Sequence, residues 1–518
     1  PPTPPDKHWL LGHALHLNPS NLGVHKESSH DVIFGAWIPK LKSKVVMFEL
    51  PVMGRFIVVG DAAVAKHVLN TKNKDNSSIV PFPKSPTYKS IFCLTGRKSI
   101  LVTEGSEWQS QRRLYNPGFT PEYLKCIVSI IGEKCDRFVA ACEKEDVNHG
   151  LPTNMWERAI DLTSDVIAQV AFGEDWGNYS EHTSENSNNE RDADYEIRKC
   201  GIQTLENTRK LATIVGLNNK GPLQRLFNFF RMYRSWRLSV SLDRDMKRLV
   251  QRRLDSMSHM EENNQSDNDS LTKSKDILSM TLSNFLCESK DKSSSFSSDD
   301  MEHVTAQLKS FYFAGHDTTA TTIAWAYWLL VQHPEKLAKA RQEVSDHVGH
   351  KWTENVLGSG KNLGDGLTYE KLQECKYLDC VAREALRLYP PASTTRYAAD
   401  PAAKHGKYKL GDSIVHINIY AIQRDPDLWG EDANDFVPER FLGENGRKLA
   451  ASHIFLPFSK GPRDCIGKYF ALLEAKIALA VLVTRFDGVA VDAEKEVYMA
   501  RLTSLPMNGC NVKLSRRV

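Results

Sequence analysis

The chain has 518 residues, of which 41% are hydrophobic and 25% are charged, and its formal net charge at pH 7 is +3. This composition is ordinary for a globular protein, and so small a charge argues against nucleic acid as a partner. The ten cysteines include no C-x-x-C pair and no regular spacing, which indicates buried thiols in a reducing compartment and excludes a disulfide framework.

The first predicted elements are strands within residues 43–70. Residues 44–50 and 56–59 are rich in β-branched and alternating apolar residues, with proline and glycine between them. This pattern predicts a small sheet joined by a turn, and the proline-containing stretch that follows to about Gly105 is predicted to be loop. No apolar run reaches the roughly 18 residues that a membrane-spanning helix needs.

Residues 106–255 show a mainly helical pattern. Within them, residues 227–237 combine aromatic and basic side chains, which suits a helix at a membrane interface or, alternatively, an amphipathic helix with its aromatics packed inward. The stretches 261–275 and 288–298 are rich in Ser, Asn, Asp and Lys. They offer too little apolar area to order themselves, so we expect mobile polar inserts across residues 261–298.

Residues 299–333 are predicted to form one long helix. Asp299 and Glu302 suit a capping box at its start, and Pro334 follows its end. At 1.5 Å per residue, such a helix is roughly 50 Å long and can cross a large domain. Its centre reads A-G-H-D-T-T at residues 314–319, where the Thr318 hydroxyl can bond the carbonyl four residues earlier and open the helix.

The most specific pattern is F-x-x-G-x-R-x-C-x-G at residues 458–467. Its glycines, Gly461 and Gly467, allow the backbone to approach a flat group closely. Backbone N–H groups after Cys465 can point at its sulfur, and Arg463 can bind a carboxylate in a bidentate manner. Phe458 can shield one face of such a group. A cysteine presented in this way suits thiolate ligation of a heme iron, which favours O–O bond cleavage.

This loop resembles the heme-binding loop of the cytochrome P-450 superfamily of heme-thiolate monooxygenases. Further motifs stand in the family's order from about Pro1 to about Met507: W-x-x-x-R at 108–112, A-G-x-D-T-T at 314–319, E-x-x-R at 384–387 and P-E-R-F at 438–441. The resemblance implies a single domain over residues 1–518, mainly α with small β-sheets (α+β), in which heme b lies between the long central helix and the cysteine loop.

The resemblance also implies roles for individual residues. Thr318 is expected to hydrogen-bond the oxygen that the heme activates, and Asp317 to help feed protons from solvent. A buried charge network of Glu384, Arg387 and Arg440 is expected to hold the heme-binding core and to be structural. Heme contacts are expected from Cys465, as the axial ligand of the iron, and from Phe458, Gly461, Arg463, Gly467, Trp108, Arg112, Arg396, Ala314 and Gly315.

An apolar pocket is expected to take a lipophilic small molecule such as a terpenoid, steroid, polyketide or alkaloid, with secondary metabolism as one setting. The pocket residues expected are Phe311, Phe313, Ala314, Thr318, Ala392, Thr394, Thr395, Leu505 and Met507. The chain has no G-x-G-x-x-G after a strand, so electrons should come from a separate NADPH-dependent flavin reductase that docks on the cysteine side. Arg113, Lys460 and Lys468 are candidate contacts for it.

The proline-rich residues 1–13 resemble the hinge that follows the anchor helix of microsomal, eukaryotic members, and the polar inserts have a fungal style. We therefore expect a monomer at the endoplasmic reticulum membrane, facing the cytosol, whose N-terminal anchor precedes this sequence. A natural proline-rich start is the alternative. The same site residues serve hydroxylation as well as phenol coupling, desaturation or ring closure. A non-catalytic heme sensor or carrier is a further alternative, against which the Asp317–Thr318 pair argues.

Overall fold

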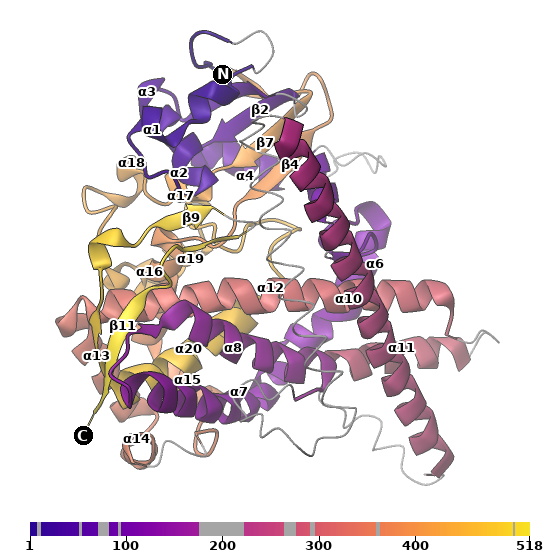
Figure 1. Cartoon of the computed structure of the whole chain (residues 1–518), viewed down its shortest axis with the longest axis vertical. Coiled ribbons are helices and arrows are strands. Elements are labelled where there is room, and N and C mark those ends of the chain that lie inside the picture. Colours follow the sequence, from indigo (N-terminus) through magenta and orange to yellow (C-terminus); the bar gives the residue numbers. More distant parts are fainter. Residues whose placement is uncertain are drawn as a thin grey trace.

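The computed structural model describes residues 1–7, 12–50, 54–70, 82–91, 95–175, 222–263, 276–290, 296–358, 363–500 and 503–517. They form a mainly helical molecule with small sheets (Figure 1), which confirms the predicted fold class. The helices are α1 (Pro19–Leu22), α2 (His30–Gly35), α3 (Trp37–Lys40), α4 (Ala62–Asn70), α6 (Gly105–Tyr115), α7 (Pro121–Ala141), α8 (Met155–Ile167), α10 (Pro222–Asn263), α11 (Ile277–Lys290), α12 (Ser298–Val331), α13 (Pro334–His347), α14 (His350–Leu357), α15 (Tyr369–Glu374), α16 (Lys376–Leu388), α17 (Ile419–Ile422), α18 (Pro426–Trp429), α19 (Gly443–Ala451) and α20 (Lys468–Arg485).

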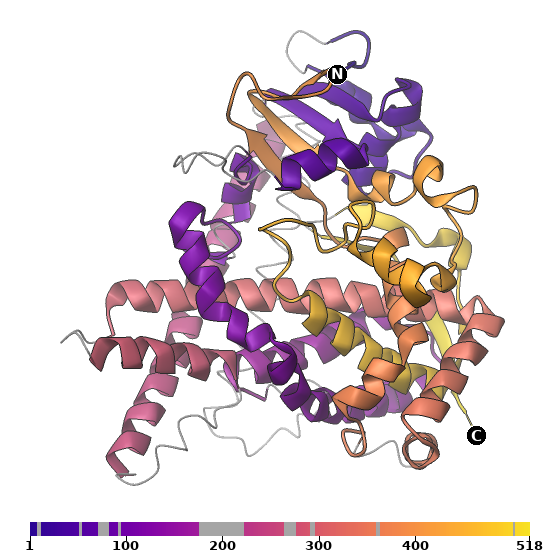
Figure 2. The same cartoon turned by 180° about the vertical axis from the view of Figure 1, so that it is seen from behind.

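Helix α12 is the centre of the fold and crosses the whole molecule (Figures 1 and 2). Nearly every side chain from Val304 to Val331 is buried, which is the pattern of a helix enclosed by protein on all sides. The sheet-containing part with the N-terminus lies on one side of α12, and α7, α8 and α20 lie on the other. Helices α8 and α20 both pack directly on α12, so the cysteine loop that precedes α20 is brought against the central helix.

The start of α12 differs from the prediction in its capping residues. Ser297 is the N-cap, and its side chain forms a reciprocal capping box with Asp300. The expected partners, Asp299 and Glu302, instead both face the Lys98 ammonium. A serine hydroxyl directly before the helix competes better for the free N–H groups than a carboxylate one residue inside it.

The main sheet has four strands in the order β1-β2-β7-β4, namely β1 (Val45–Leu50), β2 (Gly54–Val59), β7 (Ser413–Ile417) and β4 (Thr394–Ala398). Strands β1 and β2 confirm the predicted hairpin, with Val45 opposite Val59. Residues 62–70 of the same predicted stretch form helix α4 instead of strand. In β4 the residues alternate between the two faces of the sheet, as strand geometry requires.

Smaller sheets complete the fold. Strands β3 (Thr153–Asn154), β11 (Asn511–Arg516) and β8 (Phe486–Ala490) form a second sheet, and β5 (Lys404–His405) pairs with β6 (Tyr408–Lys409). Strand β9 (Tyr498–Ala500) pairs with β10 (Ser504–Pro506). This last pair places Thr503 beside the middle of α12.

Helix α11 lies between the two polar stretches, inside the range predicted to be mobile. Ile277, Leu278 and Leu282 are buried, so this short apolar segment gains enough burial to fold although its flanks are polar. Residues 264–275 and 291–295 of the insert region lie outside the described residues. So do the side chains of residues 222–236, and with them most of the aromatic and basic run, whose backbone belongs to α10.

The structure describes only part of the predicted hinge at residues 1–13. Residues 8–11 of the predicted hinge lie outside the described residues, while the carbonyl of Pro2 and the N–H of His13 bond to strand β1. Within the part of the chain that the structure describes, no helix is both long enough and apolar enough to cross a membrane.

Candidate active site

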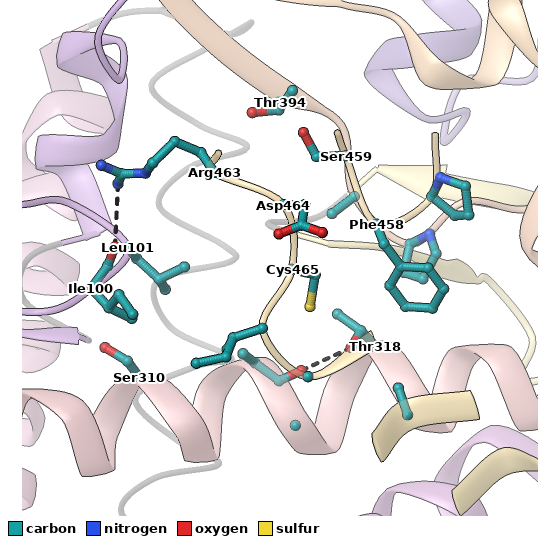
Figure 3. A pocket seen from close by; sticks show the side chains of 18 of the residues that line it. Ile100, Leu101, Ser310, Thr318, Thr394, Phe458, Ser459, Arg463, Asp464 and Cys465 are labelled. Carbon is teal, nitrogen blue, oxygen red and sulfur yellow. Dashed lines mark hydrogen bonds between the residues drawn. The ribbon is translucent and has the colours of Figure 1, made fainter. Parts of the chain in front are cut away.

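A large cavity lies between the cysteine loop and the middle of α12 (Figure 3). It encloses about 1410 Å³ that no atom fills, part of it open to solvent. Most of the residues predicted for the site line it: Trp108, Arg112, Phe311, Ala314, Gly315, Thr318, Ala392, Thr394, Phe458, Arg463, Cys465 and Gly467. The fold therefore gathers side chains from α6, α12, β4 and the cysteine loop around one space.

The cysteine loop is held by its own backbone. The N–H of Cys465 donates to the carbonyl of Phe458 at 2.9 Å, and Gly461 adopts a positive φ of 78°. A Cβ on Gly461 would lie 2.3 Å from the carbonyl oxygen of Leu69. This glycine is thus needed for the turn and for packing against the end of α4, whereas we had expected it to admit a flat macrocycle. Gly467 does line the cavity.

The sulfur of Cys465 points across the cavity toward the part of α12 that carries Thr318 (Figure 3). The sulfur is accessible from the cavity, and the burial of Cys465 among protein atoms raises the pKa of its thiol. A hydrogen bond from the Gly467 N–H and the positive charge of Arg112 act in the opposite direction. Sulfur that receives an N–H bond and faces open space suits metal ligation, because a coordinated metal ion removes the thiol proton outright.

The opposite wall of the cavity is the middle of α12. The hydroxyl of Thr318 donates to the carbonyl of Ala314 at 2.8 Å, as the sequence predicted. The helix nevertheless stays continuous from Ser298 to Val331, so this bond does not open it. A Cβ on Gly315 would lie 2.9 Å from Cδ1 of Ile167. Gly315 therefore makes room for α8, while Ala314 is the small residue exposed to the cavity.

Asp317 lies away from the cavity lining and has no exposure to solvent. Its carboxylate accepts a hydrogen bond from the Thr503 hydroxyl. The sequence predicts that Asp317 helps to feed protons from solvent. Because the side chain is enclosed between α12 and the segment before β10, any such proton has to come through a neighbour such as Thr503.

One end of the cavity is strongly cationic. Arg463 donates to the carbonyl of Thr103 at 2.8 Å and to the Glu104 carboxylate at 2.9 Å, and its guanidinium lies 4.6 Å above the Trp108 ring. Arg112 donates to the carbonyl and the carboxylate of Asp464, at 2.7 and 3.0 Å. Both arginines are thus held in place by acceptors of the protein itself.

Lys84 lines the cavity at this end, and Arg396 lies beside it, outside the lining; neither has a carboxylate partner among the described residues. Arg396 is 3% exposed, and its Nη2 atom has no hydrogen-bond partner in the described structure. Lys84 lies 4.3 Å above the ring of Tyr88, and burial, with the charges of Arg396 and Arg463, lowers the pKa of Lys84 to about 8. Burial raises the pKa of Tyr88, but the charges of Lys84 and Arg396 outweigh it and bring the value to about 7. Sequence reasoning missed Lys84 and Tyr88, which belong to no motif.

These residues fit an iron protoporphyrin. Arg112, Arg463, Lys84 and Arg396 gather at one end of the cavity, where the nearby carboxylates are those of Glu104 and Asp464. This surplus of positive charge suits the two propionates of the porphyrin. The orphaned nitrogen of Arg396 and the lowered pKa values of Lys84 and Tyr88 indicate that an anion belongs there. The cysteine sulfur would hold its iron as a thiolate.

A family model described as Cytochrome P-450 matches residues 1–507. The chain belongs to the cytochrome P-450 family. Cytochrome P-450 709B1 of Arabidopsis thaliana is 28% identical over 88% of this chain and 79% of its own length. Cytochrome P-450 72A552 of Barbarea vulgaris is 31% identical over 74% of this chain and 66% of its own length. The Arabidopsis thaliana cytokinin hydroxylase is 29% identical over 80% of this chain and 72% of its own length.

The fold agrees with this assignment. A crystal structure of a mutant cytochrome P-450DA heme domain superposes with a TM-score of 0.75 over 100% of this chain and 98% of that one, at 20% identity. Family and fold together show that this P-450 is a monooxygenase of the heme-thiolate type. The geometry around Cys465 can therefore be interpreted in terms of that chemistry.

The three residues expected to form a charge network in this P-450 lie together. Glu384 and Arg387 on α16 are both fully buried and joined by two hydrogen bonds of 2.7 Å. The Nε atom of Arg440 lies 3.4 Å from the same carboxylate. Its Nη1 donates to the Trp429 carbonyl at 3.1 Å, and its Nη2 donates to the Asp432 carbonyl at 2.6 Å. One carboxylate thus serves two guanidiniums, which offsets the cost of burying all three groups.

Gln423 is a structural residue of the site that belongs to none of the motifs identified in the sequence. It is fully buried, and its amide nitrogen donates to the carbonyls of Leu386 and Arg387 at 3.0 and 2.9 Å. Its amide oxygen accepts from the N–H of Leu456 at 2.7 Å. Gln423 therefore links α16 to the segment that leads into the cysteine loop, and no local signal revealed these distant partners.

Four of the residues predicted for the substrate pocket lie outside the cavity lining: Phe313, Thr395, Leu505 and Met507. Thr394 faces the cavity, so the neighbouring Thr395 faces the other side of β4, where it bonds Thr87. Phe313 packs against the main core, and Leu505 is buried within the β9–β10 pair. The Met507 backbone bonds Val497 instead of turning into the cavity.

Proposed function

We propose that this P-450 uses O2 and electrons from NADPH, delivered by a separate flavin reductase, to hydroxylate a lipophilic small molecule. The observation that carries the proposal is that Cys465 and Thr318 face each other across one cavity with mainly apolar walls (Figure 3). Heme, when bound through Cys465, supplies the activation of O2. The relative named cytokinin hydroxylase supports hydroxylation as the class of reaction.

The residues of the chain divide the remaining work. Lys84, Arg112 and Arg463, which line the cavity, and the neighbouring Arg396 would bind the propionates and so fix the orientation of the heme. The hydroxyl of Thr318 donates its proton to the Ala314 carbonyl. By rotating, this hydroxyl can donate into the cavity instead. Asp317 and Thr503 lie behind it as a proton source, through their mutual hydrogen bond.

The substrate is a lipophilic molecule of the terpenoid, steroid, polyketide or alkaloid kind. The side chains that would contact it are mostly apolar: Ile100, Leu101, Phe119, Ile167, Phe311 and Ala392. Ser310 and Thr322 are among the few polar handles on the helix side of the cavity. An apolar wall with few polar groups selects a substrate by its size and shape and fixes its orientation only weakly. Secondary metabolism is a setting that such a substrate would suit.

The reductase would dock on the side of the cysteine loop, with the P-450 held as a monomer at the endoplasmic reticulum membrane. Arg113 is exposed there and available. Lys468 is paired with Asp464 at 3.1 Å, and Lys460 donates to the Ala450 carbonyl at 3.0 Å. Of the three predicted contacts, Arg113 is therefore the one whose charge is least engaged within the protein.

The test begins with the absorption of the ferric protein in the Soret region during titration with a panel of lipophilic metabolites. A thiolate spectrum that shifts to high spin with one compound class identifies the class. NADPH consumption with a reductase, and the mass of the product, then follow. Product heavier by one oxygen atom supports hydroxylation, and a product without that gain indicates coupling, desaturation or ring closure. Heme without NADPH consumption in the presence of a shifting ligand would refute the proposal in favour of a sensor or carrier.

A further inference from the structure

Helix α20 carries a buried carboxyl group that the proposed chemistry does not use. Glu474 is 1% exposed, and neither of its carboxyl oxygens makes a hydrogen bond of ordinary geometry in the described structure. No lysine or arginine of the described residues pairs with it. Glu384, the other buried glutamate among the described residues, is paired with Arg387, and the partly buried Glu143 is paired with Arg485. Glu474 is therefore unusual within this chain.

An ionised carboxylate in such a place carries a large desolvation penalty, since nothing compensates its charge. Burial accordingly raises the pKa of Glu474 well above its ordinary value, and the Thr319 hydroxyl only partly opposes the shift. The titratable group that faces it from α7 is the buried thiol of Cys135, whose own pKa is raised by burial and, in part, by the charge of Glu474. Geometry and surroundings both favour the neutral acid.

The Thr319 hydroxyl is the polar group of α12 that acts on Glu474. Three other hydroxyls of the same helix, those of Ser310, Thr318 and Thr322, bond the carbonyl four residues earlier at 2.8 to 2.9 Å. Thr319 makes no such bond in the part of the chain that the structure describes. Its hydroxyl is thus left to Glu474, although Thr319 also lines the cavity directly beside Thr318.

We propose that Glu474 is held as a neutral carboxylic acid that donates its proton in a hydrogen bond to Oγ1 of Thr319, and thereby directs the Thr319 hydroxyl proton toward the cavity. A small rotation of the carboxyl group completes the bond. Glu474 keeps its proton throughout turnover, because releasing it would leave an unpaired charge in the core. Glu474 is then a positioning residue, and Thr319 is a second oriented hydroxyl beside Thr318.

The part of this inference that concerns catalysis rests on the proposed oxygen activation, whereas the protonation state of Glu474 does not. The first measurement is therefore spectroscopic. Infrared difference spectra of the holoenzyme at neutral pH, wild type against Glu474→Gln, should show a protonated-carboxyl C=O band that shifts in heavy water. A carboxylate band in its place overturns the proposal, whatever the activity.

Coupling of NADPH use to product is the second measurement. Loss of one oriented hydrogen bond corresponds to a factor of roughly five, so Glu474→Leu and Thr319→Val should each raise the ratio of hydrogen peroxide to product by about that factor. The double variant should have a ratio of hydrogen peroxide to product only slightly above that of either single variant. Glu474→Gln should recover most of the coupling that Glu474→Leu loses, because its amide also donates. Heme content and thermal midpoint confirm that each variant is folded.

The infrared and coupling measurements together distinguish the ways in which the proposal can be wrong. If Glu474→Gln is as uncoupled as Glu474→Leu while the infrared band is present, Glu474 gives up its proton and the positioning role is wrong. If Glu474→Leu retains the coupling of the wild type, Glu474 does not act on the reaction. If the wild type itself consumes no NADPH with a reductase, the proposed function fails, and the infrared result still decides the state of Glu474.

Discussion

The carboxylate of Glu384 and the guanidinium of Arg387 form two hydrogen bonds of 2.7 Å each, and neither side chain has any exposure to solvent. Arg387 gives its remaining donors to the carbonyls of Gln423, Ala433 and Asp435. The pair therefore anchors α16 to the long segment that leads to the cysteine loop.

Arg387→Ala should yield protein that fails to retain heme. The change leaves the Glu384 carboxylate buried with only Arg440 near it, and breaking a buried pair costs about 3–5 kcal/mol. Soret absorbance per protein and urea denaturation measure the two effects. Arg383→Ala on the same helix is the matched control, since its partly exposed pair with Asp379 should be worth less than about 1 kcal/mol. Normal heme loading in Arg387→Ala would rule out the structural role.

Cys465→Ser should remove the thiolate signature from the reduced, carbon-monoxide-treated absorption spectrum, because no other sulfur lines the cavity in the described structure. The loop should persist, since its backbone bond from Cys465 to Phe458 does not involve the side chain. Cys126→Ser, at an exposed cysteine on α7, should leave the spectrum unchanged. A retained signature in Cys465→Ser would place the ligand elsewhere.

Thr318→Ala should keep heme and divert electrons to hydrogen peroxide. The variant loses the hydroxyl at the cavity wall, so product formation should fall by about tenfold or more, toward the roughly hundredfold of a full general-acid contribution. Thr318→Ser, which keeps the hydroxyl, should stay within a factor of about three of the wild type. Peroxide and product are counted per NADPH consumed. Equal coupling in the alanine variant would reject a role for Thr318.

Lys84→Met should weaken heme retention without unfolding the protein. Lys84 belongs to the cationic end of the cavity, so the substitution removes one positive charge from the place where two propionates are expected. We expect roughly tenfold faster transfer of heme to a scavenging protein, which corresponds to about 1.4 kcal/mol for one charge-assisted hydrogen bond. Lys40→Met, at a lysine over the Trp37 ring outside the cavity lining, serves as control. An unchanged rate of heme transfer in Lys84→Met would mean that Lys84 does not help to hold the heme.

Glu474→Gln should become more stable than the wild type as pH rises. The folded protein holds the Glu474 proton, since its pKa is raised well above the ordinary 4.5, while the unfolded chain releases it near that value. The folded state therefore binds more protons above about pH 4.5, and wild-type stability falls there by up to about 1.4 kcal/mol per pH unit. Glutamine does not titrate.

Urea unfolding between about pH 5 and about pH 8 measures this difference. Glu444→Gln, at an exposed pair with Lys448, is the matched control and should show no such trend. A constant difference between Glu474→Gln and the wild type across this range would mean that the folded protein ionises Glu474.

Several features of the site were predictable because they depend on short spacings. Glu384 and Arg387 stand three residues apart, and Thr318 stands four after Ala314, so a single helical turn brings each pair together. The loop around Cys465 follows likewise from its glycine and its local backbone bonds. The structure also shows neighbours that the sequence did not indicate: Gly461 packs against Leu69 and Gly315 against Ile167, and both neighbours come from distant elements.

Sequence alone was sufficient for the family, the long central helix and the cysteine loop that faces it, because periodicity and one dense motif encode them locally. It could not show that Lys84 meets Arg396, that Gln423 reaches Leu456, or that Glu474 faces Thr319 without a counter-ion. Those relations join elements far apart in the chain. The charge state of a buried group depends on every neighbour that the fold supplies, and that set exists only once the helices have packed.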